Sequence, residues 1–285
     1  KIDMKIQIAL AQINTVLGDL NKNLERHLEL ASDAVENKAD ILVFPELSMT
    51  GYSLQDLVPE TAIRPLKKDP IFSKLLEASK NIDLMVGFIE EDIRHRFYIS
   101  AGYLSGGELI HLHRKVYLAT YGIFDEKRFM AAGDSFRAFN TKFGRFGMLI
   151  CEDFWHISSP YLLWLDGADC LLLQSASPGR GVTEEYIGSA NWVENINRSY
   201  AGLFTSFVAH ANRVGFEDGL YFWGGATLYD PDGKLVVKGP YYEESLTYTE
   251  MDLNQLRRTR IRLPLLRDER QDVTLRELER MKKNG

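Results

Sequence analysis

The chain has 285 residues, of which 45% are hydrophobic and 26% charged, with a formal net charge of −6. This length and composition suffice to bury one substantial core, and the acidic balance argues against a dedicated nucleic-acid-binding protein, which would carry a basic face. The 2 cysteines are too few for a disulfide framework, and no apolar run reaches the length of a membrane span. With Met4 as the expected natural start and no signal peptide, we expect a soluble protein of the reducing cytoplasm.

The first half of the chain predicts alternating strands and helices. Residues Lys5–Gln12 alternate apolar and polar side chains, which indicates a strand. Asp19 can then cap a helix whose apolar positions, from Leu20 to Val35, recur every three or four residues. The other elements predicted in this half are a strand over Ile41–Phe44, a helix over Pro70–Asn81, a strand over Leu84–Ile89, and a hairpin of Phe97–Leu104 with Glu108–Lys115.

The second half predicts mostly strands. Asp230-Pro231-Asp232-Gly233 is typical of a turn, and Thr274 with Glu277 predicts a capping box for a short last helix. The remaining predictions are a helix over Thr183–Tyr200 and strands over Phe136–Asn140, Arg145–Cys151, Cys170–Ser177, Thr205–Asn212, Ala226–Tyr229, Lys234–Lys238 and Leu246–Met251.

This order of elements predicts one α/β domain. Hairpins mixed with crossovers favour two sheets packed face to face and covered by helices. No Pro- or Ser-rich linker interrupts the chain. We expect the domain to cover residues 1–285, with a core at about 4–255 and a C-terminal extension at 256–285.

Three reactive side chains stand at the ends of predicted strands. They are Glu46 in FPELSMTGY, Lys115 in LHRKVYL and Cys151 in LICEDFW. Because strand carboxyl ends in open α/β sheets face the ligand crevice, the three can converge there. A carboxylate can take the thiol proton and an ammonium can stabilise an oxyanion, so together they would form an acyl-transfer site. Taken singly, each has a simpler interpretation: Cys151 as a small buried apolar residue, Glu46 as a turn cap and Lys115 as a solvated strand end.

The segments FPELSMTGY, HRKVYLATYGIFDEKR and GMLICEDFW occur in the same order as three signature segments of the nitrilase, or carbon–nitrogen hydrolase, superfamily, which the chain resembles over nearly its whole length. The resemblance implies a four-layer αββα sandwich that dimerises through helices beside the active site. It also implies that Glu46 is the general base, Lys115 the oxyanion stabiliser and Cys151 the nucleophile of an enzyme that hydrolyses amides, nitriles or carbamoyl groups through a thioester.

Within the superfamily, TYGIFDEKR, CEDFW and SASP are most similar to the glutaminase domain of glutamine-dependent NAD synthetase. This similarity implies that Glu126 either binds a substrate α-ammonium or orients Lys115. The same comparison points to Tyr121 and Phe124 as pocket residues. We expect Tyr52 and Trp155 to form pocket walls, although ordinary core packing is an alternative for these two and for Phe124. Ser177 would add a polar contact, Arg180 would pair with a substrate carboxylate, and the backbone N–H of Glu152 would help to hold the oxyanion.

Two departures separate the chain from that branch. No synthetase segment with its SGGxDS-type loop follows the hydrolase segment. Ser177-Pro178 is followed by GRGVTEE, where the branch usually has an aromatic residue and a lysine. Glutamine as substrate is therefore weighed against N-carbamoyl amines, nitriles and other amides.

Other functional patterns are weaker. His111 and His113 could face one side of a strand and bind a metal, but no third metal ligand is evident. A papain-like pairing of Cys151 with His156 or His210 would leave Lys115 without a role. No nucleotide-binding loop occurs, so we expect neither metal nor cofactor. The arginines at positions 257, 258, 260 and 262 are expected to pair with carboxylates on their own surface.

The sequence thus predicts an amidase that acts on a small glutamine-like ω-amide, releases ammonia and forms a homodimer or higher homo-oligomer. One alternative is a glutaminase subunit that delivers ammonia to a separate NAD synthetase chain, which copurification with an ATP-dependent ligase would reveal. Another is a binding protein that keeps the fold without turnover, which an unreactive Cys151 would support.

Overall fold

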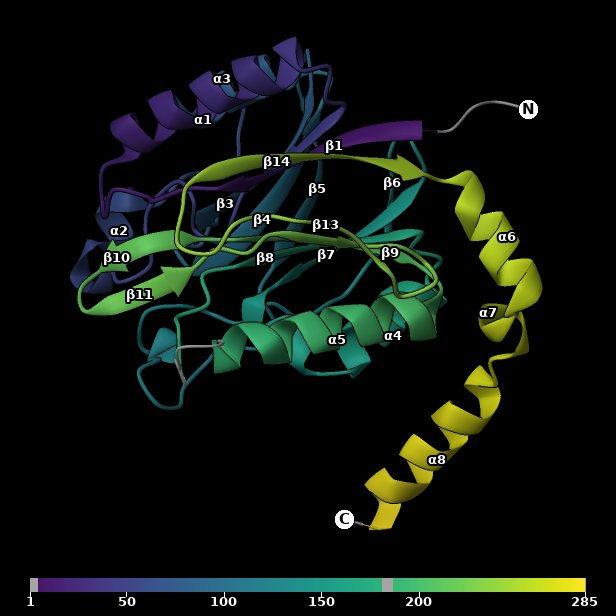
Figure 1. The fold of residues 1–285 in the computed structure, drawn as a ribbon. Coiled ribbons are helices and arrows are strands. Elements are labelled where there is room, and N and C mark those ends of the chain that lie inside the picture. The colour runs from purple at the N-terminus through teal and green to yellow at the C-terminus, as the bar shows by residue number, and fades with distance from the viewer. Residues whose placement is uncertain (1–4, 181–186, 285) are drawn as a thin grey trace.

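The computed structural model describes residues 5–180 and 187–284, and two sheets dominate them (Figure 1). The first sheet contains β1 (Lys5–Gln12), β2 (Ile41–Val43), β3 (Asp83–Glu91), β4 (Phe97–Ser105), β5 (Glu108–Arg114) and β14 (Ser245–Asp252). The second contains β6 (Phe139–Asn140), β7 (Arg145–Ile150), β8 (Cys170–Ser175), β9 (Phe207–Asn212), β12 (Thr227–Tyr229) and β13 (Leu235–Lys238). A separate hairpin pairs β10 (Val214–Glu217) with β11 (Leu220–Trp223).

The strand orders are β14-β1-β2-β3-β4-β5 and β13-β12-β9-β8-β7-β6. Strands β1, β2 and β3 run parallel in the first sheet, and β7, β8 and β9 run parallel in the second. The ends of the parallel strands therefore form the natural place for a site, because their loops can carry side chains toward one crevice.

Helices cover the outer face of each sheet. Helices α1 (Leu20–Glu36) and α3 (Phe72–Ala78) lie on the first sheet, and α4 (Ser158–Leu165) and α5 (Gly188–Phe204) lie on the second (Figure 1). The layers therefore follow the order αββα that the family resemblance implied. The shorter helices are α2 (Val58–Thr61), α6 (Asn254–Arg262), α7 (Leu265–Asp268) and the 3₁₀ turns η1 (Gln55–Leu57), η2 (Glu126–Arg128) and η3 (Cys151–Trp155), and the chain ends with α8 (Gln271–Asn284). Among the described residues, none of the helices combines the length and apolar character that crossing a bilayer requires.

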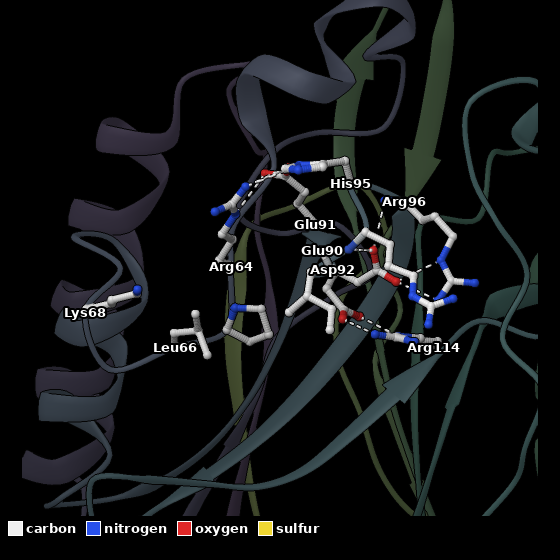
Figure 2. A pocket seen from close by; sticks show the side chains of 12 residues that line it. Arg64, Leu66, Lys68, Glu90, Glu91, Asp92, His95, Arg96 and Arg114 are labelled. Carbon is white, nitrogen blue, oxygen red and sulfur yellow. Dashed lines mark hydrogen bonds and ion pairs between the residues drawn. The ribbon is translucent and has the colours of Figure 1, made fainter.

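The turn from β3 to β4 carries a concentration of charge beside a cavity of about 670 Å³ (Figure 2). Arg64 binds Glu91, and Arg114 binds Glu90 through Nη2 and Oε1 at 2.5 Å. Arg96 likewise pairs with Asp92. These three pairs neutralise one another, and Lys68 and Arg94 add positive charge to the lining of the cavity.

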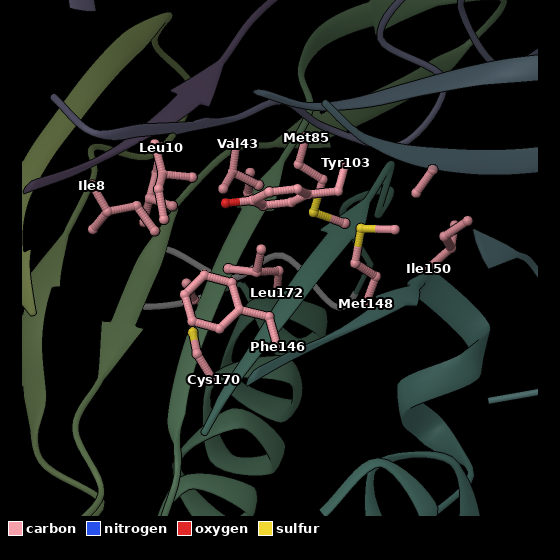
Figure 3. Packing of buried hydrophobic residues seen from close by; sticks show 14 of the residues in the cluster. Ile8, Leu10, Val43, Met85, Tyr103, Phe146, Met148, Ile150, Cys170 and Leu172 are labelled. Carbon is pink, nitrogen blue, oxygen red and sulfur yellow. The ribbon is translucent and has the colours of Figure 1, made fainter. Parts of the chain in front are cut away.

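The two sheets pack against each other through alternate side chains of their strands (Figure 3). On β1, Ile8 and Leu10 point into the layer between the sheets, whereas Ala9 and Ala11 face the helices. On β8, Cys170 and Leu172 point inward in the same way. Burial of both faces of β8 explains why this strand is a continuous apolar run in the sequence.

Gly147 permits the close approach of α4 to the second sheet. A Cβ at this position would lie 2.8 Å from Cδ1 and 3.2 Å from Cβ of Leu163 on α4. Contacts at that distance would force the helix away from β7, which leads directly to Cys151.

Most predicted strands are confirmed, and so is the Asp19 cap, whose carboxylate accepts the Lys22 N–H at 3.0 Å. The predicted capping box is wrong, because α8 begins at Gln271 and Thr274 lies inside it, where its hydroxyl is 3.3 Å from that of Tyr161. The predicted start of the helix at Thr183 lies outside the described residues. Helices α4 and α6 and the β10–β11 hairpin were not predicted.

The C-terminal segment is only partly separate from the sheets. The expected boundary at residue 256 falls inside α6, whose Leu256 is buried in the layer between the sheets. Arg260 on the same helix binds Asp169 at 2.7 Å. Arg258 binds Asp252 and Arg262 binds Asp232, so the predicted pairing with carboxylates is confirmed for three of the four clustered arginines. Beyond α7, α8 extends away from both sheets (Figure 1).

Candidate active site

The turn after β2 holds Glu46 in a fixed position. Glu46 is buried, and Leu47, which follows it, has a positive φ of 52°. Gly87 on the neighbouring strand lets this turn come close, because a Cβ there would lie 2.5 Å from the Pro45 carbonyl oxygen and 2.7 Å from the Leu47 nitrogen. Glu46 Oε2 accepts the Ala176 N–H at 2.9 Å. The carboxylate therefore joins the end of the first sheet to the loop after β8.

Lys115 follows β5 and is also buried. Its N–H donates to the Ile99 carbonyl at 2.8 Å, so its backbone continues the ladder to β4. Its Nζ is 2.8 Å from Glu46 Oε1 and 2.8 Å from Glu126 Oε1. One ammonium thus lies between two carboxylates, an arrangement that fixes its position and charge.

Glu126 begins η2, and donors occupy both of its oxygens. Oε1 accepts from Lys115 and from the Tyr52 hydroxyl at 2.7 Å. Oε2 accepts the Ala119 N–H at 2.9 Å, while the Glu126 N–H donates to the Ala119 carbonyl at 3.1 Å. These contacts direct the carboxylate toward Lys115.

Cys151 stands where β7 changes into η3. Its φ is 47°, a conformation that costs a non-glycine residue about 1–2 kcal/mol and is common at functional sites. The sharp strand-to-turn change places the half-buried thiol at the wall of a cavity of about 490 Å³. The Cys151 cavity is lined by Ala119, Tyr121, Phe124, Glu126, Cys151, Glu152, Trp155, Ser177, Pro178, Arg180, Gly188, Ser189, Trp192 and Val193.

Burial and neighbouring charge set the protonation of the site. Burial raises the pKa of the Cys151 thiol well above its usual range, and the Glu46 carboxylate adds to this effect. Burial also raises the pKa of Glu46, although Lys115 opposes the change. Burial acts to lower the pKa of Lys115, but Glu126 and Glu46 outweigh it and hold that pKa well above the usual value. The resting thiol is therefore neutral and needs a base, while the ammonium stays charged.

Most of the predicted pocket residues lie in the Cys151 cavity. The Tyr121 hydroxyl donates to Glu152 Oε2 at 2.7 Å, and the Arg180 guanidinium stacks 5.0 Å from the centre of the Phe124 ring. Tyr52 differs, because it lines a smaller neighbouring cavity and reaches the site only through its hydroxyl contact with Glu126. Burial, with Glu126 nearby, raises the pKa of Tyr52 well above its usual value, so the hydroxyl remains a donor.

Sequence reasoning missed three lining residues on α5. Gly188, Ser189 and Trp192 come from the first turns of this helix. Trp192 is 65% exposed and lies off the apolar stripe of the helix. A large aromatic side chain on the polar face was the signal that could have identified it.

The histidines have partners of their own. His210 lies 2.6 Å from the Ser175 hydroxyl and 3.1 Å from the Asn197 amide nitrogen, and burial lowers its pKa to about 3. His111 stacks on Phe139 with ring centres 4.5 Å apart. These contacts give both rings structural roles.

The fold agrees with comparison to known proteins. Residues 7–261 match the carbon-nitrogen hydrolase family. The chain belongs to this family. As a carbon-nitrogen hydrolase it is an enzyme that acts on carbon–nitrogen bonds, which confirms the resemblance drawn from the three ordered motifs.

Curated proteins with similar sequences include glutamine-dependent NAD(+) synthetases. The glutamine-dependent NAD(+) synthetase of Acinetobacter baylyi is 30% identical over 255 residues, covering 90% of this chain but 46% of the relative. The structure of the Acinetobacter baumannii enzyme superposes with a TM-score of 0.78 at 27% identity, covering 88% of this chain and 46% of the other. This hydrolase therefore spans less than half the length of these relatives. A carbon-nitrogen hydrolase from Helicobacter pylori G27 shares the fold, with a TM-score of 0.84 at 23% identity over 94% of this chain and 96% of the other.

Proposed function

We propose that this carbon-nitrogen hydrolase cleaves a small glutamine-like ω-amide through a thioester on Cys151. The observation that carries the proposal is the contact of one ammonium, Lys115 Nζ, with both Glu46 and Glu126 beside the cavity that holds Cys151. A base, a cation and a nucleophile are thus available in one buried site.

In the proposed cycle, the Cys151 sulfur attacks the amide carbon while Glu46 takes the thiol proton. Lys115 and the backbone N–H of Glu152 stabilise the negative charge on the carbonyl oxygen. Glu46 then returns the proton to the amide nitrogen, the C–N bond breaks, and ammonia leaves. Glu46 next takes a proton from water, the resulting hydroxide cleaves the thioester, and the proton returns to the Cys151 sulfur.

The contacts favour separate roles for the two acids of the cavity. Glu126 accepts from three donors, Lys115, the Tyr52 hydroxyl and the Ala119 N–H, whereas Glu46 accepts from two, so we assign Glu126 to orienting Lys115. Glu152 faces the cavity with Oε1 3.4 Å from His156 Nε2, and it is the acid that we propose accepts a substrate α-ammonium. Arg180, at the same cavity, supplies the positive charge for a substrate α-carboxylate.

Ammonia release from a panel of substrates tests this assignment. We expect glutamine to be hydrolysed without ATP and with EDTA present, ahead of asparagine, N-carbamoyl amines, aliphatic amides and nitriles. Glu152→Gln should raise KM for glutamine at least about tenfold, because a charge-assisted contact contributes roughly 1.5–3 kcal/mol. It should leave a simple aliphatic amide almost unaffected. Glu126→Gln should lower kcat for both classes equally. Turnover confined to nitriles, or abolished by EDTA, would contradict the proposal.

The pH dependence of kcat/KM should report the ionisation of Glu46. Only the carboxylate can take the thiol proton, so activity should fall as pH drops through the Glu46 pKa, which burial raises. The midpoint should lie above the value of about 4.3 for an exposed glutamate. Lys115, with its raised pKa, should cause no loss below about pH 10. An acidic midpoint at or below that of an exposed glutamate would argue against Glu46 as the base.

The relatives support a second candidate function, in which the released ammonia serves a separate synthetase chain. The A. baylyi relative is a glutamine-dependent NAD(+) synthetase, and this chain aligns with 46% of it. We would mix the purified hydrolase with an ammonia-dependent NAD synthetase and supply glutamine. NAD formation that resists an added ammonia scavenger would support direct delivery, whereas scavenger-sensitive formation would indicate release into solution.

A further inference from the structure

Asp153 lies two residues after Cys151 and belongs to none of the roles assigned above. Its side chain is fully buried, and that of its partner His113 is 3% exposed. A buried carboxylate is costly unless several donors or a cation compensate it. The hydrogen bonds that stabilise the buried Asp153 carboxylate come from the segment around Lys115 and from the residue before Cys151.

Four donors reach the Asp153 carboxylate. Oδ1 accepts the N–H groups of Val116 and Tyr117, each at 3.0 Å. Oδ2 accepts the Ile150 N–H at 3.1 Å and lies 2.8 Å from His113 Nε2. Since an ionised carboxylate can only accept, His113 carries a proton on Nε2. Three of the donors flank Lys115, and the fourth precedes Cys151.

We propose that Asp153 is a positioning residue that fixes the distance between Lys115 and Cys151. The inference rests on the proposed function, in which these two side chains act on the same carbonyl group. Cys151 has a positive φ, so its backbone needs support that β7 alone does not provide. The side chain of Asp153 provides it by joining the start of η3 to the segment after β5, which belongs to the other sheet.

Replacement by asparagine tests the proposal with little change in shape. In Asp153→Asn an NH₂ group faces at least one N–H donor, whichever way the amide is turned. We expect the two segments to move apart and kcat to fall about 10²-fold, the loss that a displacement of roughly 1 Å can cause. KM should stay within about threefold, and alkylation of Cys151 by iodoacetamide should slow in parallel.

Asp83 offers a matched control. Its side chain is also fully buried, and its carboxylate accepts hydrogen bonds from the hydroxyl groups of Tyr103 at 2.8 Å and Ser105 at 2.6 Å. However, Asp83 lies at the start of β3, at the opposite end of the parallel strands from Glu46. Asp83→Asn should lower Tm while leaving kcat and the Cys151 alkylation rate unchanged. Equal losses of kcat in both variants would reduce Asp153 to a general structural role and overturn the proposal.

His113 provides a second test if Asp153→Asn does not fold. His113→Leu removes one donor to the carboxylate and should lower kcat and the alkylation rate, whereas His113→Gln keeps an N–H donor and should retain more of both. Wild-type values in His113→Leu, or in a folded Asp153→Asn protein, would contradict the proposal. Because alkylation needs no substrate, the comparison still decides the role of Asp153 if glutamine proves not to be hydrolysed.

Discussion

Replacing Cys151 with alanine should abolish ammonia release from every amide that the enzyme hydrolyses. In the proposed cycle the thiol of Cys151, which lines the cavity, is the nucleophile, and without it no thioester can form. Loss of a nucleophile typically removes about 10⁶ in kcat, which places the variant at the background of an ammonia assay. The fold should survive, because the side chain is small and only half-buried.

Cys170→Ala is the matched control for this variant. Cys170 is fully buried between the sheets, and burial raises the pKa of its thiol far above the usual value, so it should neither react nor contribute to turnover. We expect normal kcat with a modest loss of stability from the small cavity that remains. If iodoacetamide modifies Cys170 first and thereby inactivates the enzyme, the assignment of Cys151 is wrong.

Glu46→Gln and Lys115→Met should each lower kcat/KM by at least about 10²–10⁴, the usual cost of losing a general base or an oxyanion donor. Glutamine cannot take the thiol proton, and methionine keeps the length of the lysine side chain without its charge. Each change also leaves buried charge without its partner, so stability will fall as well. Circular dichroism must therefore show folded protein at the assay temperature before the rates are compared.

The neighbouring pair Arg114–Glu90 supplies controls of the same chemistry. Arg114 precedes Lys115 in the chain, and Glu90 lies on β3. The two side chains bind each other at 2.5 Å beside the cavity of Figure 2. Arg114→Met and Glu90→Gln should cost stability but leave kcat/KM within about threefold, because neither touches the substrate in the proposed cycle. Near-normal turnover in Glu46→Gln or Lys115→Met would remove that residue from the catalytic site.

The sequence predicted those helices and strands in which apolar residues recur at regular spacing. Strand β1 alternates clearly, and α1 has a regular apolar stripe with a capping aspartate, so both were found with nearly correct bounds. Helix α4 (SSPYLLWL) was missed because its own apolar residues occur on all sides of the helix, so that no single apolar stripe marks it in the sequence. The β10–β11 strands are four residues each and contain glycine or follow it, so their pairing depends on tertiary contacts that sequence periodicity does not report.

The site was also predictable only in part, because some of its contacts join residues that are far apart in the sequence. Strand ends identified the positions of Glu46, Lys115 and Cys151, and the family resemblance supplied their roles. The sequence left two roles open for Glu126, and the contacts with Lys115, Tyr52 and Ala119 now favour orientation of the lysine. Asp153 was missed because three of its four donors lie 36, 37 and 40 residues away in the chain, a distance that no local motif spans.

Trapping the acyl-enzyme tests the proposed thioester on Cys151 directly. The enzyme is mixed with glutamine, quenched in acid during turnover, digested and analysed by mass spectrometry. We expect a mass increase equal to one γ-glutamyl group on the peptide that contains Cys151, reversed by hydroxylamine and absent from Cys151→Ala. An acyl group on any other residue, or rapid ammonia release from Cys151→Ala, would contradict the proposal.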